Sequence, residues 1–227
     1  MSARLQDDKL DRDVHNLSFG GGSPLTGLII IKNSDHIPNL ICIETNTIEG
    51  GINKDMIKSL FTPVVWKIKK YLIVLQYTYQ PMNIVLTMVN SRFGQRYENQ
   101  KNEKIDEGVF KAEMGRHLKE ENCVDGLDNP LKIAEIKGLI EYFYSKGAKV
   151  MFFQMPVYKE ISSSARYVQR ENKLRQAFSD MNIEWSQLGD NADDKYLTAD
   201  GIHLIPRSAG EFTVEINNRI REISTSF

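Results

Sequence analysis

The sequence predicts an α/β protein of three layers, in which helices cover both faces of a mostly parallel sheet. Short apolar runs alternate with longer segments whose apolar residues recur at helical spacing. Each short run is bounded by polar residues, glycine or proline, as buried strands of a parallel sheet are. Repeated strand and helix units need crossover connections, and these connections place the helices against the sheet.

Three strands are expected where the apolar runs are short. The run NLICIE, residues 39–44, predicts a buried strand between polar neighbours. The run AKVMFFQMP, residues 148–156, predicts a second strand that ends at its proline. The run NIEWSQL, residues 182–188, predicts a third strand after a short turn.

The clearest helix is expected over residues 129–147. Asn129 suits the N-terminal cap, Pro130 suits the first helical position, and Gly147 suits the C-terminal cap. The apolar residues between them form one face at helical spacing. Further helices are expected over residues 54–70, residues 164–180 and Arg207–Ile223.

Composition and charge exclude several classes of protein. The chain has 227 residues, of which 26% are charged and 41% hydrophobic, which suits one soluble globular domain over residues 1–227. The net charge of −1 gives no indication of a nucleic-acid partner. Cys42 and Cys123 form no C-x-x-C pair, so neither a disulfide framework nor a cysteine metal site is predicted. Cys42 is expected to be a buried thiol.

Three of the four histidines do not predict a metal site either. His15, His36 and His117 have no metal-ligand spacing, and we expect them to be surface or loop residues. Residues 91–128 are polar and charged, which predicts an insertion or lid with some helix. We therefore expect no metal and no cofactor.

The most apolar region, residues 71–89, does not predict a membrane-spanning helix. Two glutamines, a proline and an asparagine interrupt it, so we expect a buried helix and a turn, with contact to a membrane surface as the alternative. The first twenty residues are charged and polar and have no signal-peptide pattern. The localisation stays open, and the sequence as it stands favours the cytoplasm.

Three loops carry the candidate chemistry, because open parallel sheets place their working residues at the carboxyl ends of strands. One contains Gly20–Gly22, one contains Asn46, and one contains Asp200 and His203 before the last helix. Each also fits a purely structural interpretation, as a turn or a helix cap; Ser23 suits an N-cap. A phosphate-binding glycine loop is a weaker alternative, because the Lys-Ser/Thr ending is absent.

Three sequence blocks together resemble blocks of the SGNH hydrolases, the GDSL-type esterases and lipases. These blocks are HNLSFGGGSPLTGL at residues 15–28, IETN at residues 43–46 and TADGIHL at residues 198–204. Their order matches the family, and DGIHL followed by a proline and a helix is typical of it. The resemblance implies a three-layer fold of flavodoxin-like type, and we expect its first strand to be missing from the sequence as it begins at Met1.

The resemblance also implies a role for each candidate residue. His203 would be the base that takes a proton from a serine nucleophile, and Asp200 would orient it. The backbone N–H of Gly21 and the side-chain amide of Asn46 would donate hydrogen bonds to the oxyanion.

The nucleophile can be placed in two registers within MSARLQ. In one register Ser2 is the nucleophile and the preceding glycine of the family is absent; in the other, Ala3 occupies that position and the domain is inactive. We favour Ser2. Glu44 stands where the family usually has glycine, and a carboxylate there opposes an oxyanion unless it points away or is paired.

The predicted function is hydrolysis or transfer of an acyl group of an oxygen ester. A small-molecule or carbohydrate ester is the expected substrate, and an acylated carbohydrate or cell-envelope polymer suits the polar insertion by analogy with the fold. The alternative is a catalytically silent SGNH-like domain that binds such a ligand or serves as a scaffold. Ala3 and Glu44 would favour that alternative.

Overall fold

The structure, a computed structural model, describes most of the chain. The described residues are 5–6, 9–11, 13–17, 23–34, 37–48, 50–62, 107–121, 130–186 and 195–225. The chain forms two compact units, Met1–Ile52 with Ile105–Phe227, and Asn53–Lys104. In the second unit the described part is helix α2 (Lys54–Phe61) and its flanks, where the Asn53 side chain accepts a hydrogen bond from the Met56 N–H at 2.9 Å.

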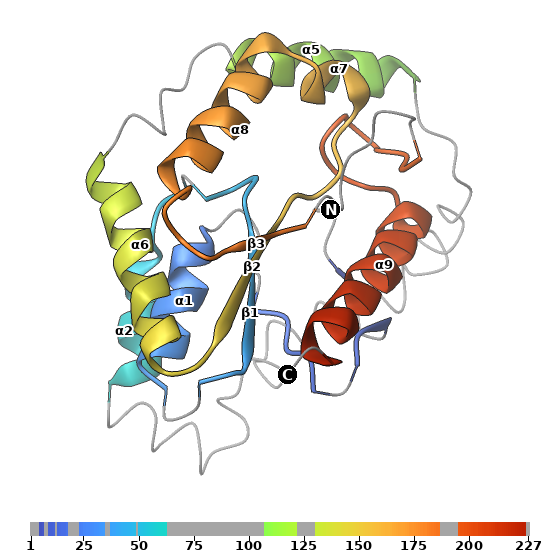
Figure 1. Cartoon of the computed structure of the whole chain (residues 1–227). Coiled ribbons are helices and arrows are strands. Elements are labelled where there is room, and N and C mark those ends of the chain that lie inside the picture. Colours follow the sequence, from blue (N-terminus) through green and yellow to red (C-terminus); the bar gives the residue numbers. More distant parts are fainter. Residues whose placement is uncertain are drawn as a thin grey trace. The chain divides into compact units, whose positions relative to one another are not determined.

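A parallel sheet lies at the centre of the first unit (Figure 1). Within the described residues its strands are β1 (Leu40–Glu44), β2 (Lys149–Phe153) and β3 (Glu184–Trp185), in that order across the sheet. Leu40 pairs with Lys149 and Glu44 with Phe153, while β3 pairs along the other edge of β2. All carboxyl ends therefore point to the same edge of the sheet.

The strand predictions are confirmed, with one difference in length. β1 and β2 lie inside the two apolar runs at residues 39–44 and 148–156. β3 comprises Glu184–Trp185, and the Ser186 N–H donates to the Phe152 carbonyl at 2.9 Å. Gln187 and Leu188 of the predicted run lie outside the described residues. The α/β class with a parallel sheet is therefore confirmed for the first unit.

One face of the sheet is covered by helices α1 (Pro24–Lys32), α6 (Pro130–Ser145) and α8 (Ala165–Ala177) (Figure 1). The core on this face is contiguous and includes Leu25, Leu28, Ile41, Ile43, Ile136, Ile140, Phe143, Val150, Phe152, Leu174 and Phe178. Phe152 packs edge-to-face on Phe178 and Trp185, with ring centroids 5.2 Å and 4.9 Å apart. Burial of these side chains is the main term that holds α6 and α8 on the sheet.

The opposite face is covered by helix α9 (Pro206–Thr225). Its core includes Met151, Phe153, Met155, Tyr196, Leu204, Ala209, Phe212, Ile216 and Ile223. Alternation along β2 separates the two cores, because successive side chains of a strand point to opposite faces. Helices therefore pack on both faces of the sheet, as the sequence predicts.

Two of the predicted helix caps are present, one at the start of α1 and one at the end of α6. The Ser23 hydroxyl accepts a hydrogen bond from the Leu25 N–H at 3.2 Å, and α1 begins at Pro24. Gly147 adopts a φ of +83°, and its N–H donates to the Tyr144 carbonyl at 2.9 Å, which ends α6. Local sequence signals therefore determine where these helices start and stop.

The described residues nearest the N-terminus lie along α9. The backbone N–H of Gln6 donates to the Thr213 hydroxyl at 3.0 Å, and its side-chain amide donates to the Pro206 carbonyl at 2.7 Å. Farther along, the Asp11 carboxylate accepts two bonds from the Arg221 guanidinium, at 2.6 Å and 2.7 Å. Gln6 thus contacts the beginning of α9, and Asp11 contacts its last turns.

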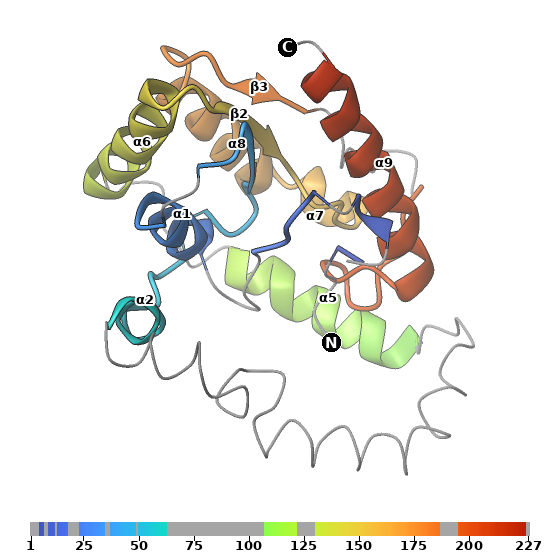
Figure 2. The ribbon, with the colours of Figure 1, turned by 90° about the horizontal axis from the view of Figure 1, so that it is seen from below.

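Helix α5 (Glu107–Glu121) lies within the region expected to be an insertion or lid, and it packs beside the short helix α7 (Lys159–Ser162) (Figure 2). Phe110 packs edge-to-face on Tyr158, with ring centroids 5.1 Å apart. Met114 and Ile161 are buried in the same cluster. This part of the polar region is therefore anchored to the first unit by an apolar face.

The prediction that His117 is a surface or loop residue is wrong. His117 lies on α5 and is only 8% exposed. It follows Phe110 by seven positions, so it shares the buried face of the helix. The apolar region at residues 71–89 lies outside the described residues. Among the described helices, none is long and apolar enough to cross a membrane.

Candidate active site

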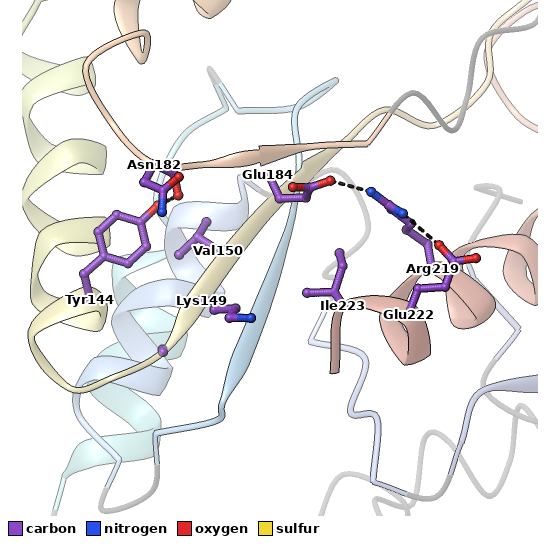
Figure 3. A pocket seen from close by; sticks show the side chains of 9 residues that line it. Tyr144, Lys149, Val150, Asn182, Glu184, Arg219, Glu222 and Ile223 are labelled. Atoms are coloured by element: carbon purple, nitrogen blue, oxygen red, sulfur yellow. Dashed lines mark hydrogen bonds and ion pairs between the residues drawn. The ribbon is translucent and has the colours of Figure 1, made fainter. Parts of the chain in front are cut away.

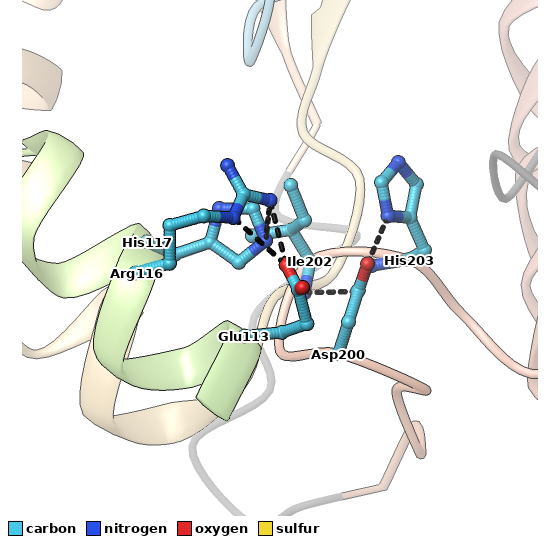
Figure 4. Close-up of polar contacts among 6 residues, drawn as sticks. All are labelled: Glu113, Arg116, His117, Asp200, Ile202 and His203. Atoms are coloured by element: carbon cyan, nitrogen blue, oxygen red, sulfur yellow. Dashed lines mark hydrogen bonds and ion pairs between the residues drawn. The ribbon is translucent and has the colours of Figure 1, made fainter. Parts of the chain in front are cut away.

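Asp200 and His203 form a hydrogen-bonded pair in the loop before α9 (Figure 4). Oδ2 of Asp200 lies 2.5 Å from Nδ1 of His203. Oδ1 of Asp200 accepts from the backbone N–H groups of Ile202 at 3.1 Å and His203 at 2.8 Å. Both oxygens of the carboxylate therefore have donors, and its orientation is defined.

The loop takes this shape because Gly201 separates the two residues. Gly201 has a φ of +98°, a backbone conformation that other residues rarely adopt. Its carbonyl accepts from the Tyr158 N–H at 2.7 Å, and the Ala199 N–H donates to the His203 carbonyl at 2.7 Å. The turn is thereby closed on itself and tied to the segment that follows β2.

The surroundings of Asp200 favour its ionised form. Burial opposes ionisation of Asp200, but the bonds from the His203 ring and from two backbone N–H groups outweigh it and lower the pKa of this carboxyl. A carboxylate beside Nδ1 places the ring proton on Nδ1 and leaves the lone pair on Nε2. The His203 side chain is 37% exposed, so the pair can accept a proton at Nε2.

Asn46 follows β1 and joins its end to the end of β2. The Nδ2 group of Asn46 donates to the Met155 carbonyl at 3.0 Å, and its Oδ1 accepts from the Met155 N–H at 2.8 Å. This two-point contact fixes the amide and gives Asn46 a structural role. Nδ2 carries two protons, so one remains for a further acceptor.

The described site residues lie at one edge of the sheet. Asn46 and Met155 both follow the carboxyl ends of strands, and Tyr158, three residues after Met155, holds Gly201. The structure therefore brings Asp200 and His203 into contact and places Asn46 at the same edge. Ser2, Ala3 and Gly21 lie outside the described residues.

Glu44 and Cys42 share the α9 side of β1, because they alternate with the buried Ile41 and Ile43. Burial raises the pKa of Glu44 to about 7 and that of the Cys42 thiol to about 12. Cys42 is therefore a poor nucleophile. Glu44 is partly protonated near neutral pH, which reduces the negative charge two residues from Asn46.

A second polar group, on α5, lies beside the Asp200–His203 loop in Figure 4. Arg116 forms an ion pair with Glu113 at 2.8 Å, and its Nη2 lies 3.3 Å from Nε2 of the buried His117. Sequence reasoning missed this group, since it predicted only an insertion or lid with some helix over residues 91–128. The recurrence of Phe110 and Met114 four residues apart was the available signal.

A cavity of about 510 Å³ lies away from this site, where β2 begins and α9 ends (Figure 3). Lys149, Glu184, Arg219 and Glu222 line it together with Tyr144, Ala148, Val150, Asn182 and Ile223. Arg219 bridges the carboxylates of Glu184 and Glu222, the latter at 2.7 Å. No sequence pattern predicts this cavity.

Comparison of the chain with protein-family models, with curated proteins and with solved structures found no match. Within the described part of the chain, no group of three or more His, Cys, Asp or Glu side chains could hold a metal ion. The chemistry of the site must therefore be argued from Asp200, His203 and their surroundings.

Proposed function

We propose that the chain is a serine esterase or acyl hydrolase of the SGNH type, with the flavodoxin-like fold that this implies. The observation that carries the proposal is the 2.5 Å contact between Asp200 Oδ2 and His203 Nδ1, with Nε2 left for a proton. A carboxylate held by three donors and an imidazole with one open nitrogen form the acid–base half of a Ser–His–Asp relay.

In this mechanism the Ser2 hydroxyl attacks the acyl carbon of an oxygen ester while Nε2 of His203 takes its proton. The backbone N–H of Gly21 and the second Nδ2 proton of Asn46 stabilise the oxyanion. The imidazolium then returns the proton to the leaving alcohol, and an acyl-enzyme remains. Water, activated by the same nitrogen, hydrolyses the acyl-enzyme and restores Ser2.

The position of the N-terminal segment supports Ser2 as the nucleophile. Gln6 is hydrogen-bonded to Pro206, which follows His203 by three residues. Ser2 precedes Gln6 by four residues, and four extended residues span at most about 14 Å. This length is compatible with a Ser2 hydroxyl at the His203 ring.

The proposed substrate is a small-molecule or carbohydrate ester, with an acylated carbohydrate as the leading class. This part of the proposal rests on analogy with the fold and on the polar region that contributes α5. The mechanism requires neither metal nor cofactor, because the serine, the imidazole and two hydrogen-bond donors supply each step.

A second candidate function is a catalytically silent SGNH-like domain that binds such a ligand or serves as a scaffold. The observation that favours it is the engagement of Asn46, whose amide already serves both backbone groups of Met155. The register that places Ala3 at the nucleophile position leads to the same conclusion.

The two candidates differ in their reaction with p-nitrophenyl acetate and a fluorophosphonate probe. We expect the parent chain to hydrolyse the ester and to be labelled, and Ser2→Ala and His203→Ala to lose both properties. His15→Ala is the matched control, because His15 is exposed and belongs to neither candidate set.

A parent chain without turnover or labelling would instead support the silent domain. In that case, labelling gained by Ala3→Ser would show that Ala3 holds the nucleophile position. Labelling that persists in Ser2→Ala would assign the reaction to another serine.

A further inference from the structure

Met114 of α5 occupies the space beside Gly201 that a side chain would otherwise fill. A β-carbon added at Gly201 would collide with Met114 Sδ and would come 3.0 Å from Ile161 Cδ1. Met114 is 8% exposed and belongs to the cluster that joins α5 to α7 and α8. The residue between Asp200 and His203 thus lies in direct contact with α5.

The other side of the turn is also held. The Tyr158 N–H donates to the Gly201 carbonyl at 2.7 Å, so Gly201 is fixed between a backbone bond and the Met114 thioether. Protein interiors are close-packed, and removal of a buried thioether leaves a cavity into which neighbouring groups relax only in part. The turn that carries the acid–base pair borders that cavity at Gly201.

The pair is sensitive to such relaxation. Hydrogen bonds weaken steeply when their angle departs from linearity, and the Asp200–His203 contact is short. Small displacements of catalytic groups reduce rates strongly, by up to about a hundredfold for a displacement of roughly 1 Å. A shift at Gly201 would be felt by both partners, since it is bonded to one and separated from the other by a single residue.

We propose that Met114 is a positioning residue for the Asp200–His203 pair, so that helix α5 sets the orientation of the histidine. The catalytic consequence rests on the proposed function, whereas the positioning itself concerns only the pair. Displacement of α5 from Gly201 would then alter the base without any direct contact between α5 and a substrate.

The test compares Met114→Ala with Met114→Leu and with Met181→Ala. Leucine retains most of the buried volume, and Met181 is a partly buried methionine in the core on the other side of the sheet from α9. The readout is the NMR signal of the His203 Nδ1 proton, which the bond to Asp200 shifts downfield and protects from exchange. We expect this signal to broaden or disappear in Met114→Ala and to persist in the other two variants.

The second readout is the hydrolysis of p-nitrophenyl acetate. We expect kcat to fall on the order of tenfold or more in Met114→Ala, with KM little changed and with recovery in Met114→Leu. Should Met114→Ala fail to fold, Met114→Val shortens the side chain less and is expected to weaken the signal in the same direction.

An unchanged Nδ1 proton signal in a folded Met114→Ala or Met114→Val variant would overturn the proposal. Equal loss in Met181→Ala would also overturn it, because the effect would then reflect general destabilisation. A parent chain without esterase activity would contradict the proposed function alone, since the NMR comparison needs no turnover.

Discussion

The two ends of the sheet carry polar groups that are organised in opposite ways. At the carboxyl end, Asp200 is held by the His203 ring and two backbone N–H groups. At the amino end, charged side chains line a cavity and pair with one another, as Arg219 does with Glu184 and Glu222. The polar groups at the carboxyl end are held by backbone donors, whereas those at the amino end are held by ion pairs between long side chains.

This difference shows that a cavity and its charges are weak indicators of a working site here. The side chains of Arg219 and Glu222 are 35% and 64% exposed, and ion pairs at such positions contribute about 0–1 kcal/mol. A carboxylate fixed by backbone donors keeps its geometry without the cost of ordering long side chains. The end whose carboxylate is fixed by backbone donors is therefore the better candidate for catalysis.

The largest effect is expected from Asp200→Asn, which tests the carboxyl end directly. An asparagine can still accept from the backbone N–H groups, but its NH₂ would face Nδ1 of His203. The ring proton would then move to Nε2, which could no longer act as a base. We expect kcat for p-nitrophenyl acetate to fall by about ten-thousandfold, the size seen for this change in a Ser–His–Asp relay.

Asp180→Asn is the matched control for that change. Asp180 forms a surface pair with Lys137 at 2.7 Å, and the same chemical change there should leave hydrolysis intact. A loss of less than tenfold in Asp200→Asn would show that the pair does not orient the base of the reaction.

The next effect concerns stability and compares two glycines, one from each end of the sheet. Gly201 and Gly147 both have positive φ, at +98° and +83°, so alanine is strained at either position by about 1–2 kcal/mol. At Gly147 a β-carbon would meet nothing within 4 Å, whereas at Gly201 it would meet Met114. We expect Gly201→Ala to lower the free energy of unfolding by about 1–3 kcal/mol more than Gly147→Ala.

Urea unfolding of the two alanine variants measures this difference. Replacement of Met114 by alanine in the Gly201→Ala background should recover part of the loss, because it removes the atoms that the new β-carbon meets. Equal destabilisation by the two alanine substitutions would mean that Met114 of α5 does not restrict the space at Gly201.

The sequence predicted those features whose signals are local. The strands at residues 39–44 and 148–156 show as short apolar runs, and the cap at Ser23 needs only its neighbours. The pairing of Asp200 with His203, which the resemblance to the SGNH hydrolases implies, likewise joins residues only three positions apart. Local patterns suffice where the interacting groups are neighbours in the chain.

Other features depend on segments far apart in the sequence. Asn46 pairs with Met155 across 109 positions, and that contact requires the register of β1 against β2. The burial of His117 likewise requires that α5 packs on α7, which a polar composition gave no reason to expect. Such contacts follow from tertiary packing, and single-sequence patterns carry little information about them.

A smaller effect is expected from Glu44→Gln, which tests the charge near Asn46. Burial raises the pKa of Glu44 from an ordinary value of 4.5 to about 7, so the folded chain binds this proton more tightly than the unfolded chain does. Its contribution to stability is complete below pH 4.5 and is lost as the pH rises to about 7. Above pH 7, glutamine should stabilise the chain by at most about 3 kcal/mol.

Urea unfolding between about pH 5, near the lower end of this window, and about pH 8, above its upper end, tests the sign of that effect. The gain of Glu44→Gln over the parent should grow with pH, whereas Glu135→Gln, at an exposed position on α6, should show no such trend. A gain that is constant with pH would place the Glu44 carboxyl in contact with water.

The smallest effect is expected from Arg219→Gln at the amino end. Its bonds to Glu184 and Glu222 are surface ion pairs, so its loss should cost less than about 1 kcal/mol and the cost should shrink further in high salt. Ester hydrolysis should be unchanged, because Arg219 lies in the last turns of α9 and His203 precedes the first turn of that helix. A tenfold loss of hydrolysis in a folded Arg219→Gln variant would instead make the cavity at the amino end part of the site, and the contrast between the two ends would fail.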